Sequence, residues 1–242
     1  MFIFNEYVLA IIGGLLPAFI WIIFWRREDR RRPEPKKLIL LAFIAGMIAV
    51  PIAIELQQWV ASVLLDNRRV EDVFVSNFLM AGTAVLLWAA IEEILKYVLA
   101  RVSVLWRDEV DEPIDPMIYL LTTAIGFSAL ENILFLFKPL SQNNFISAII
   151  TGDLRFIGAT LVHIASSAIV GFFISLSFYR RKAAKRLYIF IGLILSIALH
   201  TLFNFFIILS QGPVIIAGFA IVWAAIVVVL AIFEKAKRVH PY

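Results

Sequence analysis

The chain has 242 residues, of which 62% are hydrophobic, and its mean hydropathy is +0.92. This apolar share is well above that of an ordinary soluble domain and indicates an integral membrane protein. The net charge of +4 does not indicate a nucleic-acid partner, because the basic residues fall in short segments between apolar runs, a pattern that reflects membrane orientation. Cysteine is absent, which excludes disulfides, thiolate metal ligands and a cysteine nucleophile.

Apolar runs long enough to form membrane-spanning helices recur along the whole chain. Since lipid offers no partner for backbone polar groups, the expected fold is all-α, a polytopic transmembrane bundle. The runs leave no room for a soluble domain, so we expect one integral-membrane helical domain over residues 1–242, with the catalytic helices within 78–210. The seven predicted helices are residues 7–25, 38–65, 78–100, 117–137, 156–179, 187–209 and 214–233.

The charged loops predict the orientation of this bundle. Basic residues concentrate after the first and fifth predicted helices, within residues 26–37 and 180–186, and both loops should be cytoplasmic by the positive-inside rule. The sequence therefore predicts an N-terminus outside and a C-terminus in the cytoplasm. Turn-forming residues on the outer side are Asp66 with Asn67 and the stretch Gln211-Gly212-Pro213.

Two adjacent acids, Glu92 and Glu93, lie in the middle of the third apolar run. An ionised group at membrane depth costs at least ~2.5 kcal/mol on insertion scales, so such a pair favours a functional role. Lys96 follows Glu92 by four residues and shares its helix face, while Glu93 points about 100° away. A structural ion pair, with Lys96 reaching towards the cytoplasm, would account for one acid better than for two.

More polar residues occupy the next three apolar runs, and each alone could be a structural hydrogen bonder between helices. At 1.5 Å per residue, Glu131 and His200 lie at similar depth and Glu92 lies somewhat deeper; their side chains lean so that the three can converge. His163 leans away, and would join them only if the fifth helix is tilted or shifted. These residues are Glu131 and Asn132 on the fourth predicted helix, His163 and Ser167 on the fifth, and His200 and Asn204 on the sixth.

The order of these motifs resembles the PrsW family of intramembrane proteases, which look like distant relatives of the CAAX prenyl endopeptidases. The resemblance covers roughly residues 90–204. It implies a multi-pass protease of a bacterial or archaeal plasma membrane, which cuts a membrane-protein substrate such as an anti-sigma factor or a similar single-span regulator. The motifs that carry it are Glu92-Glu93-x-x-Lys96, Phe127-x-x-x-Glu131-Asn132, His163 and His200-x-x-x-Asn204, and the family's active-site residues correspond to Glu92, Glu93, Glu131, His163 and His200.

Peptide hydrolysis needs an activated water, a proton acceptor, a stabiliser of the oxyanion and an acid for the leaving amine. Two versions remain open. In the first, Glu131, His163 and His200 hold a Zn²⁺ and one acid of the Glu92-Glu93 pair is the base. In the second there is no metal: a buried carboxylate activates water, and His200 with Asn204 stabilises the oxyanion. Supporting roles fall to Lys96, Asn132 and Ser167.

Buried carboxylates and histidines also form proton relays and ion sites in secondary transporters, which is the alternative function. Against transport, no matching pair of helices interrupted by glycine or proline stands out. A catalytically silent membrane module that retains a client protein is a third possibility. Ion or solute flux in proteoliposomes that survives protease-dead mutations would favour transport.

Overall fold

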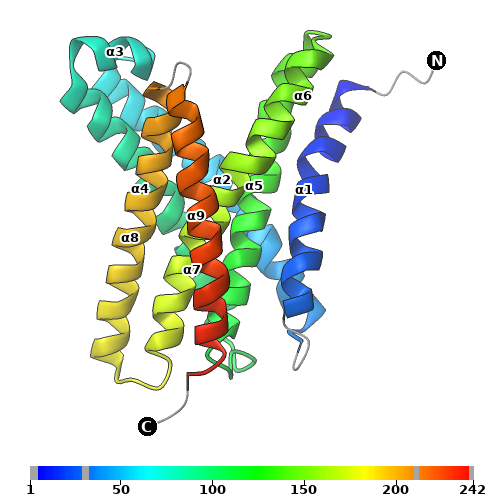
Figure 1. The fold of residues 1–242 in the computed structure, drawn as a ribbon, viewed down its shortest axis with the longest axis vertical. Helices are drawn as coiled ribbons and strands as arrows, with labels where there is room; N and C mark the ends of the chain where they lie inside the picture. Colours follow the sequence, from blue (N-terminus) through cyan, green and yellow to red (C-terminus); the bar gives the residue numbers. More distant parts are fainter. Residues whose placement is uncertain (1–4, 29–32, 210–212, 240–242) are drawn as a thin grey trace.

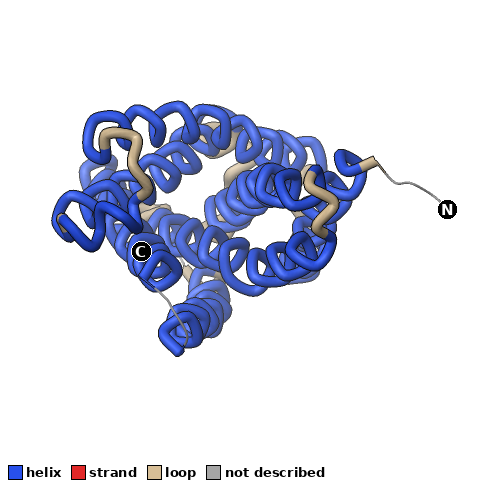
Figure 2. Tube along the Cα trace, turned by 90° about the horizontal axis from the view of Figure 1, so that it is seen from above, coloured by secondary structure: helices blue, strands red, loops and turns tan. Residues whose placement is uncertain are grey.

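The structure is a computed structural model that describes residues 5–28, 33–209 and 213–239. Helices are the only regular elements in these ranges, which confirms the all-α prediction (Figures 1 and 2). In chain order they are α1 (Glu6–Glu28), α2 (Lys36–Leu65), α3 (Val70–Ser76), α4 (Phe78–Ser103), α5 (Asp115–Ser141), α6 (Phe145–Leu154), the π-helical turn η1 (Arg155–Ala159), α7 (Thr160–Leu176), α8 (Lys182–Leu209) and α9 (Pro213–Ala236).

Seven segments of the described chain are long and apolar enough to cross a membrane, as predicted. The fifth span differs most from its predicted bounds, because α6, η1 and α7 join into one segment, Phe145–Leu176, that begins well before residue 156. Thr151, Gly152 and Asp153 interrupt the apolar run ahead of the predicted start. In the structure, Asn144 caps α6 by accepting a hydrogen bond from the backbone N–H of Ser147 at 3.0 Å.

The predicted turn after α2 is present. Asp66 and Asn67 have φ angles of 51° and 55°, in the left-handed region that asparagine and aspartate tolerate best among residues with side chains. This turn ends α2 and leads into the short α3. Part of the basic segment 26–37 (Arg30, Arg31 and Arg32) and part of the predicted turn near residue 211 (Gln211 and Gly212) lie outside the described residues.

The helices form a bundle that divides at one end (Figure 1). The upper part of α5 with α6 lies on one side, and α3 with the upper parts of α4 and α8 lies on the other. The end of α9 and the connection between α7 and α8 lie at the opposite end of the molecule. The spans thus alternate in direction, as a chain that crosses a membrane repeatedly must.

Two glycines bring α2 and α5 into close contact near the middle of the bundle. A Cβ atom on Gly46 would lie 1.9 Å from the carbonyl oxygen of Thr123, and one on Gly126 would lie 2.0 Å from that of Phe43. Small residues at such crossings let helix backbones approach within a membrane. Beyond this contact, towards α3 and α6, the two helices separate and line a cavity.

Candidate active site

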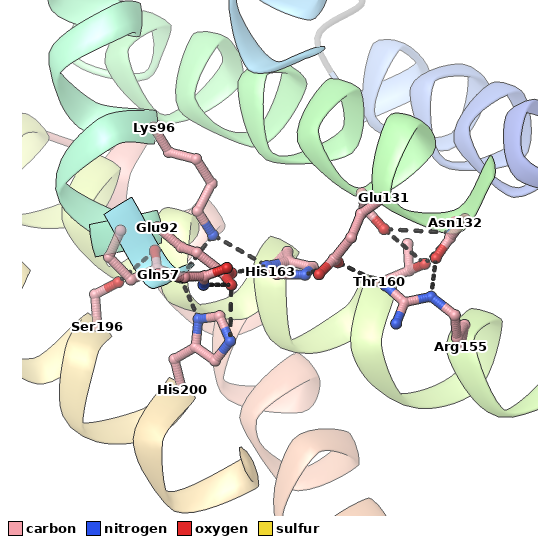
Figure 3. A network of polar contacts seen from close by, with 12 residues as sticks. Gln57, Glu92, Lys96, Glu131, Asn132, Arg155, Thr160, His163, Ser196 and His200 are labelled. Carbon is pink, nitrogen blue, oxygen red and sulfur yellow. Dashed lines mark hydrogen bonds and ion pairs between the residues drawn. The ribbon is translucent and has the colours of Figure 1, made fainter. Parts of the chain in front are cut away.

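The cavity has a volume of about 840 Å³ and is lined by α2, α4, α5, α8, α9 and the region around η1. Its inner end contains the side chains of Glu92, His163 and His200. Towards the end where α3 and α6 lie, it reaches Ala61 on α2 and Lys138 on α5. Most of its wall is apolar, so the polar residues at its inner end form a distinct group (Figure 3).

Glu92 lies at the centre of this group, on α4, with 7% of its surface exposed. Its Oε1 accepts a hydrogen bond from Nε2 of Gln57 on α2 at 2.7 Å. Its Oε2 is buried without a hydrogen-bond partner among the described residues, and faces Nδ1 of His163 at 3.8 Å and Nε2 of His200 at 3.7 Å. A buried carboxylate oxygen without a partner costs free energy, so this atom is a candidate for direct chemistry.

Glu93 is fully bonded, unlike its neighbour. Its Oε1 accepts hydrogen bonds from Nζ of Lys96 and from Nδ1 of His200, both at 2.6 Å, and its Oε2 accepts one from Oγ of Ser196 at 2.9 Å. Lys96 thus pairs with Glu93, three residues away, and not with Glu92 as their shared helix face suggested. The two adjacent acids therefore have different environments, one saturated with partners and one with a free oxygen.

His163 is part of the group, although the lean of its side chain argued against it. Its Nε2 lies 2.9 Å from Oε2 of Glu131, and its Nδ1 lies 3.2 Å from Nζ of Lys96. The ring of His163 meets that of His200 edge to face, with centroids 5.0 Å apart. The shift that this residue required is consistent with the π-helical turn η1, which lies one helical turn before it.

Arg155, which lies just before the fifth predicted helix, was not among the candidate residues. The side chain is only 13% exposed and points into the bundle. Its Nη2 donates to Oε2 of Glu131 at 2.5 Å, and its Nε donates to Oδ1 of Asn132 at 2.6 Å (Figure 3). Nothing in the sequence around this arginine indicates that its side chain faces inward.

Gln57 and Ser196 were missed as well. Gln57 could have been found, because an amide that interrupts an apolar run needs a hydrogen-bond partner. Nothing distinguishes Ser196 from other serines in such runs. Two predicted residues stay apart from the group: Ser167 is buried on α7, and Asn204 lines the cavity one turn after His200. In the described part of the chain, neither forms a hydrogen bond with the acids or histidines.

The donor atoms at the centre suit a metal ion. One oxygen of Glu92 and one nitrogen each of His163 and His200 lie within 4.8 Å of one another. The other nitrogen of each ring bonds to a carboxylate: Glu131 for His163 and Glu93 for His200. This carboxylate–histidine arrangement is what orients histidine ligands in metal sites. Glu131, a ligand in the metal version that the sequence left open, lies 2.9 Å from Nε2 of His163 and is not one of these three residues.

Comparison with known proteins identifies the family. The model of the PrsW family of intramembrane metalloproteases matches residues 34–232, most of the chain. The chain belongs to this family. It is 28% identical to Protease PrsW of Clostridioides difficile over 213 residues, covering 88% of this chain and 83% of that protein. It is 25% identical to Protease PrsW of Geobacillus kaustophilus, covering 96% and 92%.

A third relative, Protease PrsW of Bacillus subtilis, is 24% identical, with 81% of each chain covered. No solved structure matches the chain significantly. Family membership and the seven apolar helices make the protein a multi-span intramembrane protease, as the resemblance implied. They do not favour the transporter alternative. The family's description as metalloproteases agrees with a buried group, Glu92, His163 and His200, that could hold a metal ion.

Proposed function

We propose that Glu92, His163 and His200 are the catalytic centre and together hold a metal ion, with Zn²⁺ the best match. The observation that carries this proposal is the unpartnered Oε2 of Glu92, which faces one nitrogen of each histidine. One carboxylate and two imidazoles are a usual ligand set of hydrolytic zinc, and three protein ligands leave a position open for water or substrate. Bound there, Zn²⁺ would supply a Lewis acid that activates water and polarises the scissile carbonyl.

Glu93 and Glu131 determine which nitrogen of each histidine ring is free to bind a metal ion. Glu93 accepts a hydrogen bond from a protonated Nδ1 of His200, and Glu131 accepts one from a protonated Nε2 of His163. The opposite nitrogens then carry lone pairs directed towards Glu92. In this assignment Glu131 orients a ligand and is not itself one, which revises the ligand set proposed from the sequence.

Lys96 supplies the positive charge that the buried acids need. Its Nζ bonds to Glu93 and also donates to Nδ1 of His163, the nitrogen assigned to the metal. Metal binding at His163 therefore requires the ammonium to release this nitrogen while keeping its bond to Glu93. The side chain is 1% exposed, so its charge stays near the centre in both arrangements.

A metal-free route would use the same residues. Oε2 of Glu92 would take a proton from the attacking water, and His200 with Asn204 on the cavity wall would stabilise the oxyanion. Metal content distinguishes the two routes. Purified protein that contains stoichiometric zinc, loses cleavage on chelation and regains it with Zn²⁺ supports the metal site; cleavage that is indifferent to chelation supports the metal-free route.

We infer that the substrate is a membrane protein whose chain enters the cavity in an extended form. The apolar wall includes Leu134, Phe135 and Phe219, which suit side chains from a membrane segment, and the centre lies at the inner end of the cavity. With the N-terminus outside a bacterial or archaeal plasma membrane, the cavity would face the outer half of the bilayer. A single-span regulator such as an anti-sigma factor fits this geometry.

Comparing membrane-protein fragments in cells that carry the wild-type protein or the Glu92→Gln variant tests the function. We expect at least one membrane protein to be cut only in the wild type. Glu71→Gln is the matched control, because Glu71 is an exposed acid on α3 whose partner is Arg69. Identical fragment patterns for the wild type and Glu92→Gln would contradict the assignment of Glu92.

A further inference from the structure

Arg155 is the first residue of a π-helical turn. It begins η1, the one π-helical turn in the described ranges, between α6 and α7. A π turn holds one more residue than an α turn, so it rotates the preceding side chains by about 100° relative to those that follow. Such turns are frequent at functional sites. Here the side chain of Arg155, at the end of the turn that adjoins α6, is directed into the bundle.

Both ends of this turn contact α5. At the first end, Nε of Arg155 donates a hydrogen bond to Oδ1 of Asn132. Just past the second end, Oγ1 of Thr160 accepts a hydrogen bond from Nδ2 of the same asparagine at 3.1 Å. Thr160 also accepts one from Oγ of Ser128 at 2.9 Å. Asn132 therefore fixes the turn at two points, which explains its burial.

The guanidinium of Arg155 is held on three sides. It bonds to Glu131 and Asn132 and lies over the ring of Phe135, 4.0 Å from its centroid. Two directed, charge-assisted hydrogen bonds and a ring contact leave the planar group a single orientation. A lysine at this position could supply the charge but not two donor nitrogens held apart in one rigid plane.

A single oxygen links Arg155 to the catalytic centre. Oε2 of Glu131 accepts from Nη2 of Arg155 at 2.5 Å and lies 2.9 Å from Nε2 of His163. The side chain of Glu131 is 19% exposed and lines the cavity, so without the arginine only its contact with His163 would keep it from turning into that space. The orientation of the His163 ring thus depends on a residue that does not touch it.

We propose that Arg155 is a positioning residue. It holds the Glu131 carboxylate so that His163 keeps its Nε2–H on that carboxylate and its Nδ1 directed towards Glu92. Arg155 contacts neither the proposed metal nor the scissile bond in this scheme. The inference rests on the proposed function of the centre, and is tested by measurements that separate the two.

Metal affinity is the first test. Co²⁺ is titrated into metal-free purified protein against a competing chelator, and its absorption spectrum reports the ligand geometry. We expect Arg155→Gln to weaken Co²⁺ binding by about 10- to 100-fold and to alter the spectrum, since loss of such outer partners has that effect. Arg155→Lys should lie between this variant and the wild type. The matched control is Arg69→Gln, which removes an exposed arginine–glutamate pair 3.4 Å apart and should change nothing.

Cleavage provides the second test, on a substrate identified by the fragment comparison. Arg155→Ala should lower kcat at least tenfold with KM within about twofold, and added methylguanidinium should restore part of kcat by filling the vacated space. A role in folding alone would show no rescue. Size-exclusion profiles establish that each variant is folded; if Arg155→Gln is not, Arg155→Lys provides the comparison.

The outcomes distinguish this inference from the metal site. Wild-type Co²⁺ affinity and kcat in Arg155→Gln would overturn the role of Arg155 and leave the metal site intact. A wild-type protein that binds no Co²⁺ would overturn the metal site. In that case, an Arg155→Ala variant whose cleavage methylguanidinium does not restore would overturn the role of Arg155 as well.

Discussion

Nδ1 of His200 lies 2.6 Å from Oε1 of Glu93, and this hydrogen bond directs the opposite ring nitrogen towards Glu92. The two adjacent acids therefore do different work: Glu93 orients a histidine, and Glu92 presents a free oxygen. The partners of Glu93 explain how that buried carboxylate persists, whereas the free oxygen of Glu92 would be satisfied by the proposed metal ion.

Glu93→Gln and His200→Ala should each abolish cleavage by protein that still folds, although Glu93→Gln leaves the buried ammonium of Lys96 without its carboxylate and should lower stability. The first variant removes the acceptor that orients His200, and the second removes the ring itself. Because residues that act as a unit are not additive, the double variant should be no worse than either single one. Cleavage assays with matched expression levels measure this. Full activity in both single variants would contradict the assignment.

Glu92→Gln should stabilise the metal-free protein while removing its activity. Oε2 of Glu92 is buried without a partner, and a buried unsatisfied group costs about 1–3 kcal/mol. An amide can keep the contact with Gln57 and carries no charge. Thermal unfolding of metal-free protein in detergent measures the change. A lower unfolding temperature in Glu92→Gln would show that Oε2 has a stabilising partner in solution.

Lys96→Met should destabilise the protein by about 3 kcal/mol or more, because breaking a buried ion pair leaves an uncompensated charge on Glu93. The double variant Lys96→Met with Glu93→Gln removes both charges and should recover most of that loss. It should remain inactive, since His200 loses its orienting carboxylate. Chemical or thermal unfolding of the three proteins measures the coupling, and equal losses in the single and double variants would argue against the pair.

Gly126→Val should disrupt the contact between α2 and α5, because even a Cβ atom would lie 2.0 Å from the carbonyl oxygen of Phe43. Forced repacking of this kind costs about 1–3 kcal/mol or more. Gly152→Ala is the control, since its Cβ would meet only Cδ2 of Leu136 at 3.6 Å, an ordinary contact. The folded yield and unfolding temperature of both variants provide the measurement; similar values would show that the close contact is not required.

Most of the fold was predictable because a membrane-spanning helix needs a long apolar run, and the chain displays seven. The convergence of Glu92, Glu131 and His200 followed from helix rise and side-chain lean alone. The places of His163 and Arg155 did not, because a π turn lies between α6 and α7, whereas the estimate from helix rise and side-chain lean assumes an uninterrupted α-helix. Likewise, helix spacing put Lys96 nearer Glu92, whereas rotamers and neighbouring helices decide the actual pairing.

The reciprocal glycine contact between α2 and α5 also limits how the protein can admit a substrate. With Gly46 and Gly126 each pressed against the opposite backbone, these helices cannot slide or roll past one another without a clash. The crossing is therefore fixed in position, on the side of the cavity away from α3 and α6. Widening of the entrance is then left to segments beyond this crossing, such as α6, in which Ala148 is the one buried residue.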